Sequence, residues 1–267
     1  MKTREAVVDV ERKTLDSPHE TARKGPRRQE SARVMELVDR ADGRTATLEP
    51  LPPARSVQKR VFELVVSLAM AVALMPLMAL VVLLVRLDSP GPIFFRSRRV
   101  GFRGQPLHMV KFRKMHDDAT GVQLTTHGDE RFTRAGRWLA RMKLDELPQL
   151  WHVVRGDMSL IGPRPESPDF VGHHPHEYQD ITRVKPGIMG LSQLAFAGES
   201  AILDPNDPES HYVGGILPQK VALDRMYAER WSFWLDVRIA LWTVVAIVFR
   251  RDVAVDRATA QMSLRKR

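Results

Sequence analysis

An adjacent pair of carboxylates, Asp145 and Glu146, is the feature of this chain best suited to chemistry. Neighbouring residues on a helix point about 100° apart, so the two carboxylates need not share one task. One can attack a substrate while the other holds a metal ion. An isolated Asp-Glu pair is most often solvated helix surface, but this pair lies in an apolar helical pattern beside Arg141 and Lys143. That setting favours a functional interpretation.

A stretch rich in Gly and Pro follows the pair and carries an arginine suited to phosphate binding. Arg164 lies between Pro163 and Pro165, which restrict the backbone on both sides. A guanidinium can donate two parallel hydrogen bonds to a phosphate or nucleotide; an ion pair that caps the loop is the alternative. Asp157 precedes this loop and could either support a metal ion or tie the loop to the helix of the carboxylates.

Basic residues outnumber acidic ones, and cysteine is absent. The 267 residues include 41 Lys and Arg against 32 Asp and Glu, a formal net charge of +9. The lack of Cys excludes a disulfide scaffold and a metal site made of thiolates. No nucleic-acid-binding motif accompanies the charge, so we expect an anionic lipid bilayer as partner and no nucleic acid. Three basic residues could supply positive charge to substrate phosphates, although each could equally lie at the surface or against headgroups: Lys111, Arg113 and Arg141.

The longest apolar block runs from Leu64 to Val85 without a charged residue. As one helix it would be about 33 Å long, enough to cross a hydrocarbon core of roughly 30 Å. Pro76 lies near its middle and should bend the helix. Basic residues flank both ends. Because Lys and Arg favour the cytoplasmic side of a membrane, the simplest arrangement has both ends on that side. We therefore expect a re-entrant helix-break-helix over 58–88, with a plain transmembrane span and a buried core helix as alternatives.

The remaining patterns predict an α+β fold that is mainly helical. We expect a small β-hairpin from 93–95 and 107–110, and helical structure over 131–151 interrupted by Pro148. The last apolar segment, 231–250, is too short to span and is typical of an amphipathic helix at the membrane interface; packing against the catalytic domain is the alternative. The predicted divisions are a disordered polar tail at 1–57, the membrane helices at 58–88, a catalytic domain at 89–230, and an interfacial helix and tail at 231–267.

Several longer motifs occur in a fixed order between Gln58 and Arg250. They are Lys59-Arg60-Val-Phe, the apolar block with its central proline, Lys111-Phe112-Arg113-Lys114-Met115, Leu144-Asp145-Glu146-Leu147-Pro148-Gln149-Leu150, Gly156-Asp157-Met158-Ser159-Leu160-Ile161-Gly162-Pro163-Arg164-Pro165-Glu166 and Val184-Lys185-Pro186-Gly187-Ile188. Together they closely resemble the bacterial sugar transferase family, the monotopic phosphoglycosyl transferases that start polysaccharide and glycoconjugate assembly.

The resemblance implies a reaction and a place for it. A phosphosugar would pass from a nucleotide diphosphate sugar, most simply a UDP-sugar, to a polyprenyl (undecaprenyl) phosphate at the cytoplasmic face of the bacterial inner membrane. The resemblance also implies that Asp145 is the nucleophile and that Glu146 binds Mg²⁺. A carboxylate can form an aspartyl-phosphate intermediate, and a divalent cation can neutralise the diphosphate as the leaving group departs. The acceptor is a phosphate monoester, whose second pKa of about 6 leaves it largely ionised, so no general base is required.

The chain departs from the usual family pattern at several positions. Met75 replaces a Ser before the helix-breaking proline, Glu63 replaces an Asp, and Ala140 stands where many members have Arg, a charge that Arg141 could take over. The segment 195–215 also differs, so the resemblance does not identify the sugar. The alternative function is a catalytically inactive membrane scaffold or regulator of the same fold. The sequence leaves open whether two copies pair as a homodimer.

Overall fold

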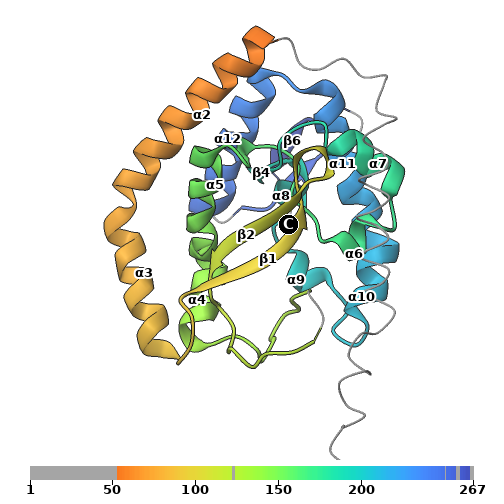
Figure 1. Ribbon diagram of the computed structural model, residues 1–267. Helices are drawn as coiled ribbons and strands as arrows, with labels where there is room; N and C mark the ends of the chain where they lie inside the picture. Colours follow the sequence, from red (N-terminus) through yellow and green to blue (C-terminus); the bar gives the residue numbers. More distant parts are fainter. Residues whose placement is uncertain (1–52, 122–123, 250, 257–258, 265–267) are drawn as a thin grey trace, which may run out of the picture.

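Two helices at the N-terminal end of the described chain form a bent rod along one side of the molecule (Figure 1). The computed structural model describes residues 53–121, 124–249, 251–256 and 259–264. Helix α2 spans Pro53–Ala73 and helix α3 spans Met75–Asp88. Most of the predicted polar tail lies outside the described residues, and α2 begins at Pro53, within the last residues assigned to that tail.

The bend between α2 and α3 lies where the sequence predicts it. The two helices are bent by 58°, and Pro76 lies in the first turn of α3. Proline has no N–H to donate to the preceding turn, so the helical ladder is interrupted there. No single helix in the described part of the chain is long and apolar enough to cross a membrane, whereas this bent pair meets that requirement jointly by length and composition.

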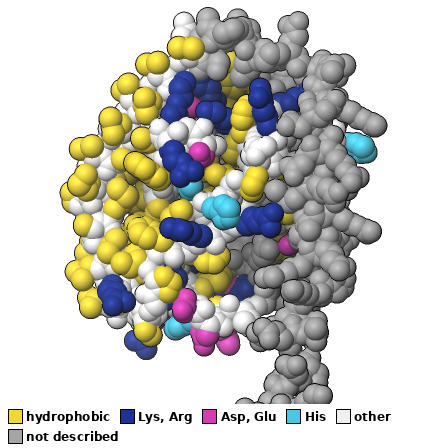
Figure 2. Space-filling model, viewed as in Figure 1, with side chains coloured by type: hydrophobic (Ala, Val, Ile, Leu, Met, Phe, Trp, Pro, Cys, Tyr) yellow, Lys and Arg dark blue, Asp and Glu magenta, His cyan; other side chains and the backbone are white. Residues whose placement is uncertain are grey.

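The outer face of the α2–α3 rod is apolar and exposed. Figure 2 shows hydrophobic side chains gathered along this side of the molecule. They include Val61, Val65, Leu68, Leu80 and Leu83. The opposite face of α3 packs inward, with Val81 and Val85 buried against Phe112 and Leu139. A large exposed apolar surface of this kind marks a contact with another apolar medium or partner.

The predicted β-hairpin is confirmed. Strand β1 (Phe94–Val100) pairs antiparallel with strand β2 (Pro106–Phe112), and Phe95 lies opposite Lys111. The connecting turn uses positive backbone φ angles at Arg103 and Gly104, 53° and 74°. Strand β2 lies against the segment that carries the two carboxylates.

The predicted helix over 131–151 is divided into three pieces. Helix α4 (Arg134–Met142) ends at Lys143, whose left-handed backbone (φ 57°) lets its N–H bond back to the last turn. A 3₁₀ segment, η2 (Leu144–Gln149), follows and contains Pro148, and helix α5 (Leu150–Arg155) continues from it. Helical structure is present from Arg134, and Pro148 lies in the 3₁₀ segment that interrupts the α-helix, but the break begins earlier than predicted, at Lys143.

Beyond α5, the described residues form short helices, two longer helices and two small sheets. The remaining elements are β3 (Ser159–Ile161), α6 (Pro168–Val171), α7 (Pro175–Ile181), β4 (Gly187–Met189), α8 (Leu191–Ala195), α9 (Glu199–Ile202), α10 (Pro208–His211), η3 (Tyr212–Ile216), α11 (Leu217–Arg230), α12 (Phe233–Val248), β5 (Val253–Val255) and β6 (Met262–Leu264). Strands β3 and β4 pair in parallel, and β5 pairs antiparallel with β6. The fold is α+β and mainly helical, as predicted.

Helix α12 has one buried face and one exposed apolar face. Leu235 and Ile239 join the main core, which also contains residues of α5, α8 and α11. Trp234, Leu241 and Val248 are exposed. The last apolar segment therefore packs against the catalytic part of the chain, the alternative left open by the sequence, and still presents an apolar surface outward.

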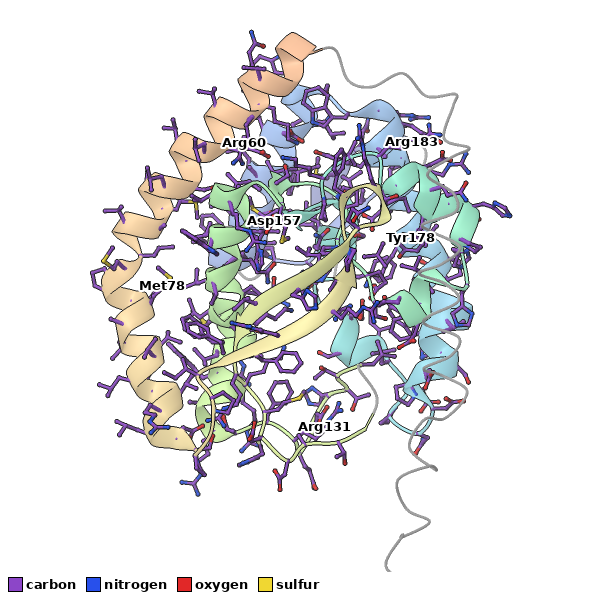
Figure 3. The ribbon with its side chains drawn as sticks, viewed as in Figure 1. Arg60, Met78, Arg131, Asp157, Tyr178 and Arg183 are labelled. Carbon is purple, nitrogen blue, oxygen red and sulfur yellow. The ribbon has the colours of Figure 1, made fainter. Side chains whose placement is uncertain are left out.

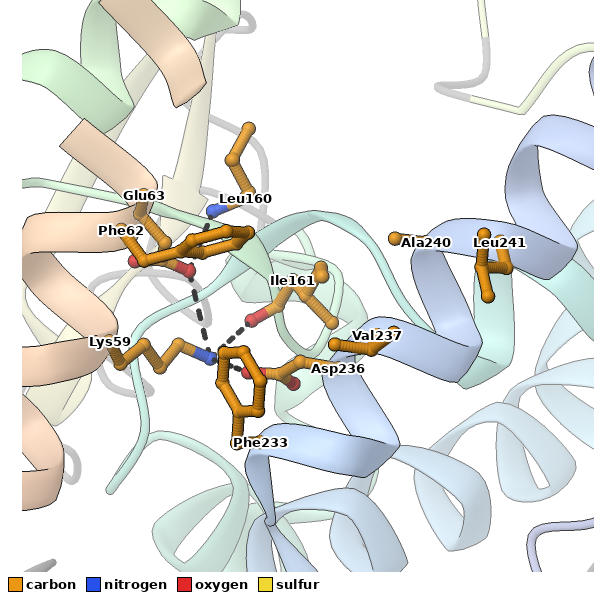
Figure 4. Close-up of a pocket in the computed structure, with 10 residues that line it drawn as sticks. All are labelled: Lys59, Phe62, Glu63, Leu160, Ile161, Phe233, Asp236, Val237, Ala240 and Leu241. Carbon is orange, nitrogen blue, oxygen red and sulfur yellow. Dashed lines mark hydrogen bonds and ion pairs between the residues drawn. The ribbon is translucent and has the colours of Figure 1, made fainter. Parts of the chain in front are cut away.

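Buried polar contacts join α2 to the catalytic part of the chain (Figure 4). Lys59 Nζ donates to Ile161 O at 3.0 Å, to Tyr227 Oη at 3.0 Å and to Asp236 Oδ2 at 2.8 Å. Glu63 accepts hydrogen bonds from the Ser159 hydroxyl and from the backbone N–H that follows it. These contacts lie beside an apolar pocket of about 130 Å³ between α2 and α12. They hold the bent rod in a fixed position relative to strand β3.

Candidate active site

The two carboxylates lie on the short 3₁₀ segment η2, which packs against strand β2. Residues in a 3₁₀ helix follow one another at about 120°, so adjacent side chains point in clearly different directions. The Asp145 side chain is only 2% exposed and the Glu146 side chain 15%. The different directions give the two carboxylates different partners.

Glu146 is held by two cations from two other segments. Lys111 Nζ, on β2, lies 2.9 Å from Glu146 Oε1. The Arg164 guanidinium donates to the same carboxylate through both terminal nitrogens, at 2.6 Å to Oε1 and 3.3 Å to Oε2. Burial acts to raise the pKa of Glu146, but the adjacent Arg164 and Lys111 outweigh it and hold the pKa well below its usual range. Burial also lowers the pKa of Lys111 to about 8.

Asp145 has a sparser set of partners. Lys114 Nζ lies 3.1 Å from Asp145 Oδ2. That oxygen is buried and receives no well-aligned hydrogen bond from any described residue. A buried carboxylate oxygen without a hydrogen bond is costly to a fold, so this arrangement is more typical of a reactive group than of a structural one. Lys114 was missed as a candidate, because only the folding of β2 against η2 brings it to Asp145.

The loop that carries Arg164 follows strand β3 and is hydrogen-bonded to the neighbouring parallel strand β4. Pro163 O accepts a hydrogen bond of 2.8 Å from Gly187 N, at the start of β4. A Cβ at Gly187 would overlap the backbone of Gly162, so the strands can approach this closely only with glycine there. The restricted loop aims Arg164 at Glu146.

A second polar network lies beside Arg164 and was not predicted. Glu166 accepts from Arg99 at 2.8 Å and from the Tyr212 hydroxyl at 2.7 Å. Lys220 Nζ in turn lies 2.9 Å from Tyr212 Oη and 2.9 Å from Glu199 Oε2. Its residues come from β1, the Pro-rich loop, η3, α9 and α11, so no local spacing in the sequence could have revealed it.

Comparison with known proteins identifies the family of this chain. Residues 54–250 match the bacterial sugar transferase family. The chain belongs to this family. The resemblance seen in the sequence is confirmed, and the carboxylate pair and Arg164 lie within the matched region.

Curated relatives in the family are named for related reactions. The chain is 38% identical over 213 residues to an undecaprenyl-phosphate glucose phosphotransferase of Komagataeibacter xylinus, which covers 76% of this chain and 38% of that relative. It is 36% identical over 206 residues to a UDP-glucose:undecaprenyl-phosphate glucose-1-phosphate transferase of Caulobacter vibrioides, covering 74% of this chain and 73% of the relative. A UDP-N-acetylgalactosamine-undecaprenyl-phosphate N-acetylgalactosaminephosphotransferase of Aeromonas hydrophila is 38% identical over 180 residues, 65% of this chain and 39% of the relative. The chain thus spans well under half the length of two of these three relatives.

Two of the residues predicted to bind phosphate do not contact the carboxylate pair. Arg113 is buried and donates to Ser89 O at 2.7 Å and Pro90 O at 2.5 Å, which fixes the turn after α3. Arg141 is exposed on α4 and makes no ion pair with the described residues. The structure therefore brings Lys111 and Arg164 to the carboxylate pair, and uses Arg113 to support the backbone.

Asp157 ties its loop to helix α5, which follows the segment of the carboxylates. Asp157 Oδ2 lies 3.2 Å from His152 Nδ1 and 2.9 Å from Arg155 Nε. His152 Nε2 accepts from Val110 N at 3.2 Å, so the ring proton lies on Nδ1 and is donated to Asp157. Figure 3 shows Asp157 next to the end of α5, with Arg60 reaching toward the same helix from α2. Arg60 donates to the carbonyls of residues 153 and 154, the last turn of α5.

Glu146 is the residue that could bind a magnesium ion together with substrate phosphates. In the described part of the chain no group of three or more His, Asp or Glu side chains could hold a metal ion alone. Mg²⁺ commonly binds through one or two carboxylates together with substrate phosphates and water. Among the described residues, Glu146 Oε2 has the longer contact with Arg164, at 3.3 Å, and could therefore still accept a metal ion.

Proposed function

We propose that this chain transfers a phosphosugar from a UDP-sugar to undecaprenyl phosphate through a covalent intermediate on Asp145. The observation that carries the proposal is the contrast between the two carboxylates. Glu146 is fixed by Lys111 and Arg164, whereas Asp145 is buried with one loosely aligned cation. The family and the names of the relatives supply the substrate classes.

The proposed reaction has two displacements at the same phosphorus. First, a carboxylate oxygen of Asp145 attacks the phosphorus that bears the sugar. The bond from that phosphorus to the bridging oxygen breaks, and the bridging oxygen leaves with the electron pair as part of UMP. Then an oxygen of undecaprenyl phosphate attacks the phosphorus, and Asp145 leaves as a carboxylate. No proton has to move in either displacement, because both attacking oxygens are already ionised.

Lys111 and Arg164 are the groups best placed to bind the diphosphate. Both are cations that already face a carboxylate, and Arg164 presents two parallel donors. Charge stabilisation by fixed cations is the main source of catalysis in phosphoryl transfer. Mg²⁺, bound through Glu146 and the diphosphate, would supply further neutralisation of the leaving phosphate. We propose that another part of the chain, the segment 195–215, determines which sugar is accepted.

The proposal places the protein at the cytoplasmic face of the bacterial inner membrane. The apolar outer faces of the α2–α3 rod and of α12 provide the contact with lipid. Because the rod is bent by 58° at a proline, we propose that α2 and α3 enter and leave the bilayer on the same side. The site can then meet a water-soluble donor and an acceptor whose phosphate lies at headgroup depth.

The test is a release assay with purified protein. The full chain is incubated with undecaprenyl phosphate, Mg²⁺ and a panel of UDP-sugars, and both UMP and the lipid-linked product are measured. We expect wild type to form both products with at least one sugar and Asp145→Asn to lose at least about 10³-fold, as expected for removal of a nucleophile. Asp180→Asn, on α7 with Arg183 and Arg225 as partners, is the matched control. If wild type forms neither product, the inactive scaffold becomes the better description; if Asp145→Asn keeps full activity, the covalent mechanism is refuted.

A further inference from the structure

The ammonium group of Lys114 contacts the proposed nucleophile on one side and an aromatic ring on the other. Its Nζ lies 3.1 Å from Asp145 Oδ2 and 5.6 Å from the centre of the Phe132 ring. An ammonium over an aromatic face is attracted by the ring. The side chain is nevertheless 27% exposed, against 2% for Asp145. The ammonium therefore bridges the buried carboxylate and the solvent from which a substrate must arrive.

The backbone of Lys114 is fixed by helix α4. Lys114 O accepts a hydrogen bond from Thr133 N at 3.1 Å, and the Thr133 side chain caps α4 by accepting from Gly136 N. A Cβ at position 136 would overlap the Lys114 carbonyl, so α4 packs directly on this peptide unit. Its neighbour along the chain, Met115, pairs with Phe132 in an isolated β-bridge. The origin of the lysine side chain is thus rigid, while its end is accessible.

This pair differs from the structural ion pairs of the same molecule. Asp236 receives aligned hydrogen bonds from Lys59, Tyr227 and Trp231. Asp145 has Lys114 near one oxygen without hydrogen-bond alignment. A carboxylate that is surrounded by aligned donors is a poor nucleophile, because its lone pairs are engaged. The Lys114 contact neutralises the charge of Asp145 in a buried position and leaves its lone pairs available.

We propose that Lys114 is a catalytic residue whose ammonium first neutralises the Asp145 carboxylate and then contacts the negatively charged non-bridging oxygens of the phosphosugar attached to it. This inference rests on the proposed function. When Asp145 attacks, its carboxylate charge is lost as the new P–O bond forms, while the attached phosphodiester keeps one negative charge on its non-bridging oxygens. The electron pair of the broken P–O bond stays on the bridging oxygen, so UMP carries away the charge that Asp145 has lost. An ammonium beside the reacting oxygen lies close to the negatively charged non-bridging oxygens of the phosphorus under attack, and so stabilises the transition state of both displacements.

The test separates the chemical step from substrate binding. Single-turnover UMP release is measured with wild type, Lys114→Met and Lys114→Arg, using whichever UDP-sugar wild type accepts, without acceptor lipid. The amount of phosphosugar that stays bound to the protein is measured in parallel. Arg137→Met, which removes an exposed charge from α4, is the control. Lys114→Gln serves as a second variant if the Met variant does not fold to the wild-type melting temperature.

We expect Lys114→Met to slow the burst of UMP by about 10²- to 10³-fold, the usual effect of removing one electrostatic stabiliser of a transition state. The KM for the UDP-sugar should change by less than about 3-fold, and Lys114→Arg should recover most of the lost rate. Arg137→Met should behave as wild type. An unchanged burst in Lys114→Met, or a loss that appears only in KM, would overturn the role of Lys114 while leaving Asp145 as nucleophile. A wild type that releases no UMP with any UDP-sugar would instead overturn the proposed function, and this inference with it.

Discussion

The stability of this protein should depend on pH through one buried carboxyl group, that of Asp224 on helix α11. Asp224 is only 3% exposed, and its Oδ1 receives no hydrogen bond from any described residue. Burial raises the pKa of Asp224 from 3.8 to about 7, although the Ser192 hydroxyl and the Lys220 ammonium act in the opposite direction. The informative change is Asp224→Asn, which keeps the shape and cannot ionise.

The direction of the effect follows from proton binding. The folded state binds this proton more tightly than the unfolded state, so the carboxyl group contributes fully to stability below the unfolded pKa of 3.8. That contribution is lost as the pH rises through the folded pKa of about 7. One pKa unit corresponds to about 1.36 kcal/mol, so the difference between 3.8 and about 7 amounts to roughly 4 kcal/mol as an order of magnitude.

The assay is urea unfolding of wild type and Asp224→Asn in the same detergent at pH 5, 6, 7 and 8. We expect the variant to gain stability relative to wild type by a few kcal/mol between the lowest and highest pH, because only wild type must ionise a buried group. Asp180→Asn, whose carboxylate is paired with Arg183 and Arg225, should run parallel to wild type over the same range. If Asp224→Asn also runs parallel to wild type, Asp224 does not titrate in this range and the reasoning fails.

Two further outcomes are expected. Gly136→Ala should destabilise the protein by about 1–3 kcal/mol, the usual cost of overpacking, because the added methyl group overlaps the Lys114 carbonyl. Gly198→Ala, where a Cβ meets nothing within 4 Å, is the control in the same thermal melts. Equal melting midpoints for the two variants would contradict the packing described. Removal of divalent cations with EDTA should abolish UMP release and Mg²⁺ should restore it, whereas activity that persists in EDTA would exclude Glu146 as a required metal ligand.

Local patterns predicted those parts of the fold that depend on nearby residues. The hairpin of β1 and β2 follows from two short apolar runs around a Gly- and Arg-rich turn, and the bend before α3 follows from Pro76. The break at Lys143 was not predicted, since a left-handed lysine has no compositional signal comparable to Gly or Pro. The same break places the carboxylates on a 3₁₀ segment instead of a continuous helix.

Contacts across the fold were harder to predict for the charged residues. Lys111, Arg113 and Lys114 are close in sequence, yet they contact Glu146, the turn after α3, and Asp145 respectively. Alternation along strand β2 and the irregular backbone after it send these side chains to different neighbours. Composition identifies such a cluster as basic, but only the packing of β2 against η2 decides which cation meets which carboxylate.

The pairing of Glu146 with two cations suggests how the proposed site is kept ready for a diphosphate. Lys111 and Arg164 would repel one another in a buried position if no anion lay between them, and the Glu146 carboxylate supplies that anion before substrate arrives. A diphosphate brings negative charge to the same two cations and so can take over part of this role. The Glu146 carboxylate would then be free to bind a divalent cation, which would neutralise part of the diphosphate charge. We therefore expect the donor and the metal ion to favour each other's binding. The diphosphate neutralises Lys111 and Arg164 when Glu146 turns to the metal ion, and the metal ion neutralises the diphosphate.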